Sequence, residues 1–349
     1  MKKCIKYLPQ HADITEKDEQ FDAPRFAVAP MMDWTDRHCR FFHRQLTQHA
    51  LLYTEMVVAD ALVHGDVDRH LMFDRDVEQP VALQIGGSEP EKLAHSARLG
   101  AQYGYDEINL NVGCPSDRVQ SGAFGACLMR EPELVARCVE AMKGAVDIPV
   151  TVKCRIGVDD QDSQVALDDF VGRVFEAGCD GLWVHARKAW LKGLSPKENR
   201  DVPPLDYDRV VRLKADWPNR FIGINGGIVD LETAARLAQQ LDGVMLGRTA
   251  YQNPALLADV DTVFYGEKPS LPNMDKVRDA MIGYAHQHMD GGGRLHHVTR
   301  HMIGLFQGQP GARRFRQIMT VDASKPGAGP QVIADAFAAI TQAKRRDAA

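Results

Sequence analysis

Cys114 lies in the segment Asn111-Val-Gly-Cys-Pro115, where a glycine and a proline flank the thiol. Because Gly and Pro both favour turns, we expect this cysteine on a loop rather than inside a strand. An unperturbed cysteine has a pKa of about 8.5, so its thiol is mainly protonated at neutral pH. That state suits a proton donor. A nucleophile would need a neighbouring base, and the only candidate, His185, lies two predicted strands further along the chain.

The cysteine pattern argues against a metal centre. The chain has seven cysteines, an odd number, and no CxxC motif, so we expect no structural zinc site. Most of them stand in apolar stretches, where a thiol behaves as a small hydrophobic group. A structural role is therefore the default for each of them, and only the loop position and the surroundings of Cys114 argue for chemistry there.

Two glycine-containing segments are typical of an anion site. They are Asn225-Gly226-Gly227 and Gly247-Arg248, and each follows a short apolar run. Glycines let the backbone approach an anion closely, and an arginine can bind it with two hydrogen bonds. The alternative is that the glycines only form turns. Because both segments show the same pattern, the phosphate interpretation is favoured.

The elements that must position these residues alternate along the chain. From Phe26 onward, short β-rich runs alternate with helical patterns, giving eight units in about 240 residues, which is the size of a (β/α)8 TIM barrel. A doubly wound open sheet is disfavoured because no GxGxxG motif follows the first strand. The predicted strands are 26–31, 51–56, 81–86, 107–112, 149–156, 181–186, 221–225 and 243–247, and the predicted helices begin at Asp36 and then span 89–99, 132–146, 166–177, 207–217, 231–241 and 254–264.

The active site of such a barrel lies at the carboxyl ends of its strands. Nearly every predicted strand ends on a polar or special residue, and a ring of them is hard to explain as packing. A phosphate at strands seven and eight, with a ring system over the barrel centre, indicates FMN. Taken alone, Lys153 could be an ion-pair partner and His185 a core histidine. The predicted FMN contacts are Pro30, Met31, Met32, Gln84, Lys153, His185, Asn225, Gly226, Gly227, Gly247 and Arg248.

A second module follows the barrel. The segment 266–272 is rich in Pro, Gly and polar residues and is predicted to be a linker. Helical patterns follow at 275–288, 296–306, 311–319 and 331–345. We therefore divide the chain into a catalytic barrel domain, 1–265, and a C-terminal helical domain, 273–349. No run reaches the roughly 18 to 20 apolar residues of a membrane span, and the first twenty residues lack a secretory signal, so we expect a soluble, cytoplasmic and monomeric protein.

These motifs, taken together, resemble the tRNA-dihydrouridine synthases. The resemblance runs from about Phe26 to Arg346. Its most specific part is the Asn-x-Gly-Cys-Pro motif with its spacing to the later lysine and histidine, and three further segments resemble the DusA subfamily. The matching segments are Ala29-Pro-Met31, Leu83-Gln-Ile-Gly86, Glu107-Ile-Asn-Leu-Asn-Val-Gly-Cys-Pro115, Val152-Lys-Cys-Arg155, Val184-His-Ala-Arg187, Asn225-Gly-Gly227 and Gly247-Arg248, with Tyr53-Thr-Glu-Met56, Ser195-Pro-Lys-Glu-Asn-Arg200 and Gly311-Ala-Arg-Arg314 for the subfamily.

The resemblance implies an FMN enzyme that uses NADPH to reduce uridine to 5,6-dihydrouridine in tRNA. It implies that Cys114 is the catalytic proton donor, and the subfamily implies a D-loop uridine at position 20 or 20a. The chemistry agrees, because hydride addition at C6 of uracil leaves a carbanion at C5 that needs a proton from the opposite face. We expect Asn111 to hold the carbonyl edge of the uracil.

A base in folded tRNA must be extruded to reach the flavin, and most of the affinity must come from phosphate contacts. We expect these contacts from Arg187, Lys197, Arg200, Arg313 and Arg316, although each alone could be a solvated charge. The net charge of −5 argues only against a protein that coats nucleic acid non-specifically. Two alternatives remain: an FMN oxidoreductase of free pyrimidines or another small molecule, and an RNA-binding protein without chemistry.

Overall fold

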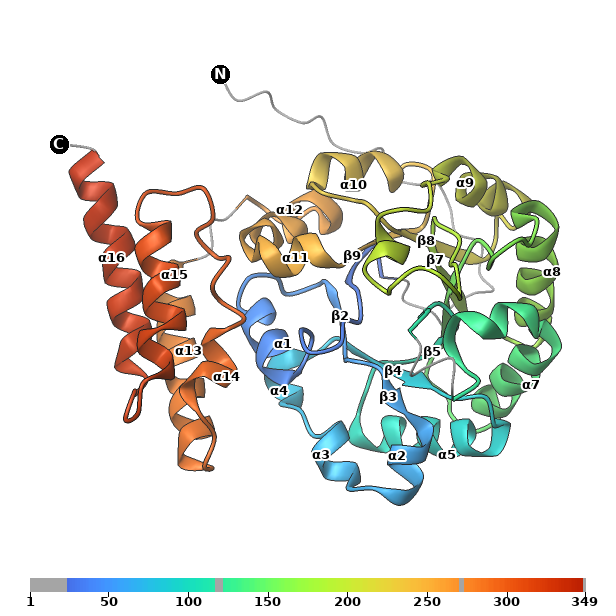
Figure 1. Ribbon diagram of the computed structural model, residues 1–349, viewed down its shortest axis with the longest axis horizontal. Helices are drawn as coiled ribbons and strands as arrows, with labels where there is room; N and C mark the ends of the chain where they lie inside the picture. Colours follow the sequence, from blue (N-terminus) through green and yellow to red (C-terminus); the bar gives the residue numbers. More distant parts are fainter. Residues whose placement is uncertain (1–23, 117–121, 270–272, 348–349) are drawn as a thin grey trace.

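The computed structural model describes residues 24–116, 122–269 and 273–347, so Cys4 lies outside the described residues. A barrel of parallel strands forms the larger part of the molecule, with helices around it (Figure 1). The helices that follow residue 273 stand together beside the barrel.

The barrel closes on itself through nine parallel strands. Strands β2 and β3 both pair with β4, at its two ends (Leu52 with Val81, and Val57 with Ile85), so together they occupy one of eight positions. The pairing of β2 with both β1 and β4 closes the ring. This confirms the predicted TIM barrel. The strands are β1 (Phe26–Val28), β2 (Leu51–Tyr53), β3 (Val57–Val58), β4 (Val81–Gly86), β5 (Glu107–Asn111), β6 (Val150–Arg155), β7 (Gly181–His185), β8 (Phe221–Asn225) and β9 (Gly243–Leu246).

Several barrel helices begin where an aspartate side chain accepts one of their free N–H groups. Asp36, Asp162, Asp206 and Asp230 each cap a helix in this way. The helices are α1 (Arg37–Arg44), α2 (Ala59–His64), α3 (Val67–Leu71), α4 (Arg75–Glu78), α5 (Pro90–Tyr103), α7 (Pro132–Lys143), α8 (Ser163–Glu176), α9 (Tyr207–Asp216), α10 (Leu231–Leu237), α11 (Arg248–Gln252) and α12 (Val260–Tyr265), with 3-10 segments η1 (Gly125–Arg130), η2 (Glu198–Arg200) and η3 (Pro254–Asp259).

Three predicted elements of the barrel differ from the structure. The first strand ends at Val28, so Ala29 to Met31 already belong to the loop over the barrel mouth. The second predicted strand, 51–56, is interrupted between β2 and β3. The helix predicted at 254–264 is η3 followed by α12, and α11 precedes it. Short elements at strand ends carry too few residues to show a clear period.

The largest fully buried side chain of the described residues, Trp183, lies in the floor of the barrel interior. Trp183 is fully buried and packs edge-on against Phe221, with ring centroids 5.1 Å apart. Two glycines make room for it, because a Cβ atom on Gly223 would lie 2.3 Å from the indole and one on Gly243 would lie 2.9 Å from it. Trp183 therefore closes the interior at this end.

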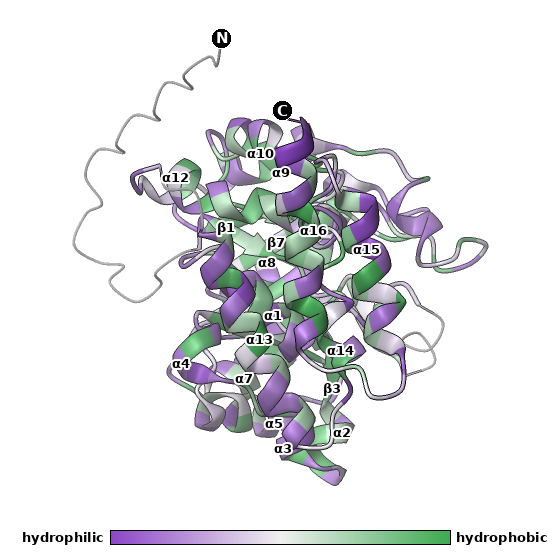
Figure 2. Cartoon of the chain, turned by 90° about the vertical axis from the view of Figure 1, so that its left-hand side faces the viewer, coloured by the Kyte–Doolittle hydropathy of each residue, from purple (hydrophilic) through white to green (hydrophobic). Residues whose placement is uncertain are grey.

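The helical domain (residues 274–347) comprises α13 (Met274–Asp290), α14 (Leu295–Thr299), α15 (Ala312–Thr320), η4 (Asp322–Ser324) and α16 (Gln331–Asp347). Its core contains three mutually packed rings, Phe306, Phe315 and Phe337, with centroids 4.9 to 5.6 Å apart. Apolar and polar residues alternate along its helices, which face the viewer in Figure 2. No helix of the described residues is long and apolar enough to cross a membrane.

The prediction of a helix at 296–306 was wrong beyond the first turn. Helix α14 ends at Thr299, whose hydroxyl donates to the carbonyl of Met319 at 2.9 Å, and turns follow. In these turns Gly304 lies against the barrel, where a Cβ atom would be 2.2 Å from the carbonyl oxygen of Gln252. The segment after Thr299 therefore forms turns that pack against the end of α11 in place of the predicted helix.

Candidate active site

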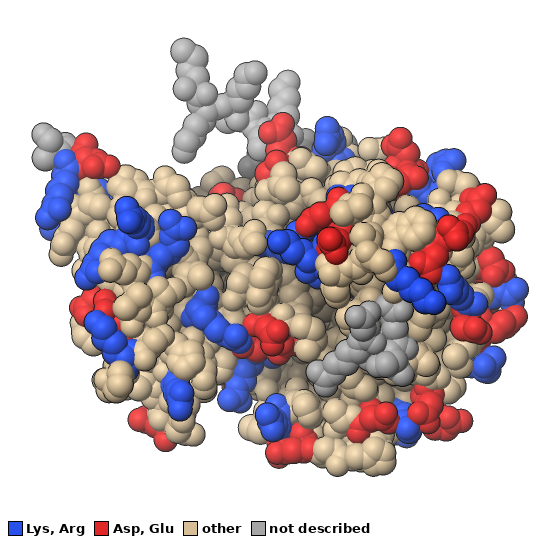
Figure 3. Space-filling view, in the orientation of Figure 1, with Lys and Arg blue, Asp and Glu red and all other residues tan. Residues whose placement is uncertain are grey.

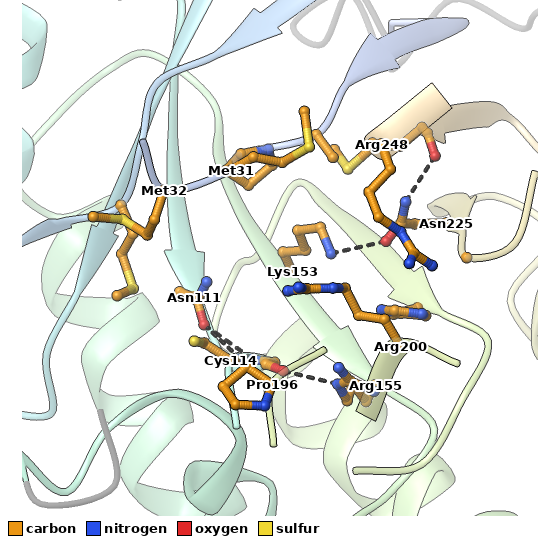
Figure 4. A pocket seen from close by; sticks show the side chains of 18 of the residues that line it. Met31, Met32, Asn111, Cys114, Lys153, Arg155, Pro196, Arg200, Asn225 and Arg248 are labelled. Carbon is orange, nitrogen blue, oxygen red and sulfur yellow. Dashed lines mark hydrogen bonds between the residues drawn. The ribbon is translucent and has the colours of Figure 1, made fainter. Parts of the chain in front are cut away.

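A cavity of about 570 Å³ opens at the carboxyl ends of the barrel strands. Every residue predicted to contact the cofactor lines it, and so do Cys114, Asn111 and Arg200. Figure 4 shows Cys114 and Asn111 on one side of the cavity and Asn225 with Arg248 on the other. The structure therefore brings the thiol loop and the two glycine segments to a single site.

The Cys114 loop is held by hydrogen bonds to three other residues, Asn111, Ala126 and Arg155. The Oδ1 atom of Asn111 accepts the backbone N–H groups of Gly113 at 3.1 Å and Cys114 at 2.9 Å. The carbonyl of Cys114 accepts the N–H of Ala126 at 2.8 Å. The thiol itself is half-buried and lies 3.5 Å from the hydroxyl of Ser116. These bonds fix the sulfur in the cavity wall, where a bound molecule can reach it.

Arg155 supplies the third set of hydrogen bonds; the sequence placed it in the matching segment Val152-Lys-Cys-Arg155 but predicted no role for it. Its Nε atom donates to the carbonyl of Gly113 at 2.8 Å. Its Nη1 atom donates to the carbonyls of Lys188 at 3.1 Å and Asn199 at 3.0 Å. The guanidinium therefore joins the Cys114 loop to the loop that follows β7. Its position two residues after Lys153, facing the same interior, was the available signal.

The charges that line the cavity have one sign. Lys153, Arg155, Arg200 and Arg248 line it, and none of its described lining residues is acidic. Burial, with Arg155 nearby, lowers the pKa of Lys153 to about 8. Its ammonium group donates to Oδ1 of Asn225 at 3.1 Å. Such an environment favours an anionic ligand.

His185 is neutral in this environment. Burial is the main cause that holds its pKa well below the usual value, and the nearby charges of Arg155 and Lys153 act in the same direction. The imidazole is only 9% exposed and lines the cavity next to Gly226. It can therefore serve as a neutral donor or acceptor rather than as a cation.

The Gly226-Gly227 turn forms a cradle that side chains would close. Both glycines have positive φ, 115° and 64°. A Cβ atom on Gly226 would lie 2.6 Å from the His185 ring, and one on Gly227 would lie 2.5 Å from Leu205. At the rim Arg248 pairs with Asp201 through two contacts of 2.7 and 3.2 Å. The cradle and the guanidinium at its rim could hold a phosphate.

Apolar side chains also line the cavity, and three of them, Met56, Met245 and Trp34, were not among the predicted site residues. They line the cavity together with Met31 and Met32, and Met245 lies beside Asn225 as its partner across β8 and β9. Trp34 stacks on Tyr251 of α11, with centroids 4.4 Å apart and planes 11° from parallel. Methionines and a fixed aromatic ring suit a flat conjugated ligand.

The remaining predicted RNA contacts lie outside the cavity. Arg187 donates to the carbonyl of Pro203, so its guanidinium is tied to its own loop. Lys197 is exposed beside η2, and Arg313 and Arg316 are exposed on α15. Figure 3 shows Lys and Arg side chains gathered on this face of the helical domain. The described residues contain no group of His, Cys, Asp or Glu side chains that could hold a metal ion.

The sequence of the chain matches the family described as "Dihydrouridine synthase (Dus)" over residues 27–341. This chain belongs to the dihydrouridine synthase family. The match spans the barrel and most of the helical domain, so a dihydrouridine synthase comprises both parts. The predicted family and the predicted enzyme class, an oxidoreductase, are confirmed.

Curated relatives within the dihydrouridine synthases are similar along nearly their whole length. A protein of Shewanella oneidensis named tRNA-dihydrouridine(20/20a) synthase is 58% identical over 315 residues, which cover 90% of this chain and 93% of the relative. Proteins of the same name from Vibrio vulnificus and Escherichia coli are 56% and 53% identical and cover 91% and 95% of this chain, and 97% and 96% of the relatives.

Proposed function

We propose that this protein reduces uridine to 5,6-dihydrouridine at position 20 or 20a of tRNA, with FMN reduced by NADPH and with Cys114 as the proton donor. One observation carries the proposal: a thiol on a fixed loop faces a cavity that has cations and a glycine cradle but no described acidic lining residue. The position and the RNA substrate rest on the relatives' names and on 53 to 58% identity.

The residues present fit FMN. The cradle of Gly226 and Gly227, with Gly247 and Arg248, would hold the phosphate. Lys153 and Gln84 would contact the polar edge of the ring, and the methionines that line the cavity would cover its apolar part. When bound and reduced by NADPH, FMN supplies the hydride that adds at C6 of uracil.

Cys114 then supplies the proton at C5. The carbonyl next to C5 stabilises the negative charge that develops there, and the thiol of Cys114 protonates that carbon. Such general acid catalysis contributes roughly 10²- to 10⁴-fold. Asn111 holds the loop through two backbone N–H groups, and its Nδ2 atom donates to Gln84 at 2.8 Å. We therefore give Asn111 a positioning role in addition to any contact with the base.

The base must leave the stack of the tRNA to enter the cavity. Arg187, Lys197 and Arg200 lie on or beside the loop after β7, and Arg313 and Arg316 lie on α15. We assign them to phosphate contacts, which supply most of the affinity of such complexes. An oxidoreductase of free pyrimidines would need neither this loop nor the basic face of the helical domain.

The test uses tRNA from a strain that lacks dihydrouridine synthases. The purified protein, reconstituted with FMN, is incubated with this tRNA and NADPH, and the RNA is digested and mapped by mass spectrometry. We expect a mass increase of two hydrogens at position 20 or 20a. A protein that binds no flavin would contradict the cofactor, reduction elsewhere would contradict the position, and turnover of free uracil or uridine in place of tRNA would support the small-molecule alternative.

A further inference from the structure

A continuous chain of side-chain hydrogen bonds runs from the Cys114 loop down to the barrel floor. Asn111 Nδ2 donates to Gln84 Oε1, and Gln84 Nε2 donates to Asn109 Oδ1, both at 2.8 Å. Asn109 Nδ2 donates to Thr151 Oγ1 at 2.8 Å, and Thr151 Oγ1 donates to Glu107 Oε1 at 2.5 Å. All five side chains face the barrel interior from β4, β5 and β6.

The hydrogen bonds in this series can be donated in only one direction, from Asn111 toward Glu107. A carboxamide has one donor end and one acceptor end, and a hydroxyl has a single hydrogen to donate. The N–H groups of Gly113 and Cys114 require an oxygen, so Asn111 must turn its NH₂ group toward Gln84. The orientation of Asn111 in turn fixes which atoms of Gln84, Asn109 and Thr151 donate and which accept. The series of hydrogen bonds must therefore end on a group that accepts a hydrogen bond from Thr151, and the carboxyl of Glu107 is that acceptor.

Burying the carboxyl of Glu107 in the barrel floor costs free energy. It is 3% exposed and lies among buried side chains, and burial raises the pKa of its carboxyl to about 7. A buried carboxyl costs free energy unless it is hydrogen-bonded, and an apolar residue of similar size would fill the floor without that cost. Its hydrogen bonds from Thr151 and from the hydroxyl of Tyr53 offset part of the cost.

We propose that Glu107 is a positioning residue for the proton donor: it terminates the hydrogen-bond chain, sets the orientation of the Gln84 and Asn111 amides, and thereby fixes the Cys114 loop. Glu107 does not touch the reacting atoms. The inference rests on the proposed function, because it explains how the loop of the assigned acid is held.

A matched pair of variants separates positioning from stability. Thr151 and Tyr53 each donate one hydroxyl hydrogen to the same oxygen of Glu107, but only Thr151 belongs to the chain. Thr151→Val and Tyr53→Phe each remove one hydroxyl from the floor. The variants are purified with FMN, and their folding is checked by thermal melting.

Two half-reactions are then measured separately. Thr151→Val is expected to slow the tRNA-dependent oxidation of reduced flavin by about tenfold or more, with flavin reduction by NADPH changed by less than about twofold. Tyr53→Phe is expected to leave both rates within about twofold. The rate at which iodoacetamide alkylates Cys114 provides a readout that does not depend on the flavin, and it should change in Thr151→Val only.

Glu107 itself is tested by two replacements. Glu107→Leu removes the acceptor and is expected to reproduce the Thr151→Val defect, whereas Glu107→Gln keeps an acceptor oxygen and should restore most of the rate. If the leucine variant does not fold, the Thr151→Val and Tyr53→Phe pair still decides the question.

The outcomes distinguish this inference from the proposed function. Equal rates in Thr151→Val and Tyr53→Phe, with Cys114→Ala inactive, would overturn the positioning role and leave the acid assignment intact. Full activity in Cys114→Ala would overturn the acid assignment itself.

Discussion

The ammonium group of Lys153 donates to the Oδ1 atom of Asn225 at 3.1 Å, across the interior from β6 to β8. This bond links the part of the cavity assigned to the flavin ring to the Gly226-Gly227 cradle assigned to its phosphate. Asn225 is oriented in turn, because its Nδ2 atom donates to the carbonyl of Met245 at 2.8 Å. Lys153 is therefore bonded to the residue that immediately precedes the glycine cradle.

The first prediction concerns the pH dependence of FMN binding. Burial and Arg155 lower the pKa of Lys153 from 10.5 to about 8 in the ligand-free protein. Above that pH the lysine loses its charge, so an anionic ligand loses a favourable interaction. We expect the Kd of FMN for the apoprotein, measured by quenching of flavin fluorescence, to rise as the pH increases from 7 through about 9.

Lys153→Met is the control for this prediction. It should bind FMN more weakly at pH 7 and should lose the rise in Kd between pH 7 and 9. A natural protein whose Kd is flat over this range, or a methionine variant with an unchanged pH profile, would contradict the placement of Lys153 beside the cofactor.

The second prediction concerns the glycine cradle. Gly226→Ala places a methyl group 2.6 Å from the His185 ring at a φ of 115°, so the turn or the histidine must move. We expect FMN affinity to fall by about tenfold or more, since the backbone can no longer approach the phosphate. Equilibrium dialysis of FMN measures this.

Gly266→Ala is the matched substitution outside the site. Gly266 also has a positive φ, 71°, but a Cβ atom there meets nothing within 4 Å. It should cost about 1 kcal/mol of stability from backbone strain and leave FMN binding unchanged. If both alanine variants bound FMN like the natural protein, the cradle would have no role in phosphate binding.

The barrel and its ring of strand-end residues could be predicted because both depend on local pattern. Alternating β-rich and helical segments define the barrel, and its geometry places strand ends such as Gln84, Lys153 and Asn225 around one opening. Contacts between distant segments could not be predicted. Asp36 pairs with Arg300, 264 residues later, and thereby joins α1 to the helical domain.

The same limit explains what was missed within the site. Arg155 donates hydrogen bonds to three backbone carbonyls of two loops. Because every residue has a backbone carbonyl, the sequence does not indicate which of them an arginine will contact. Trp34 enters the cavity wall because Tyr251, from the other end of the barrel sequence, stacks on it. The pattern places a residue on a strand or in a loop, but the partner that fixes its side chain depends on the tertiary structure.

The third prediction concerns the RNA surface. Arg313 and Arg316 are exposed on one helix, α15, and lie three residues apart. Charge reversal at both (R313E and R316E) is expected to weaken tRNA binding strongly and to reduce the slope of log K against log salt by about two. Flavin reduction by NADPH should be unaffected. Filter binding over a range of salt concentrations measures the effect.

Charge reversal at Lys344 and Arg345 of α16 is the matched control, because these residues are equally exposed at the end of the last helix. We expect a much smaller loss of tRNA binding there. Equal losses from the two double variants would indicate a general charge effect, and unchanged binding in R313E/R316E would show that tRNA contacts another face.

The central claim is that Cys114 donates the proton in uridine reduction, and a single-turnover experiment with Cys114→Ala tests it most directly. The FMN-loaded variant is reduced with NADPH and mixed with tRNA that lacks dihydrouridine, and both flavin oxidation and dihydrouridine formation are followed. We predict normal flavin reduction and tRNA binding, with dihydrouridine formation slowed by about 10²-fold or more. Dihydrouridine formation at the rate of the natural protein would contradict the account.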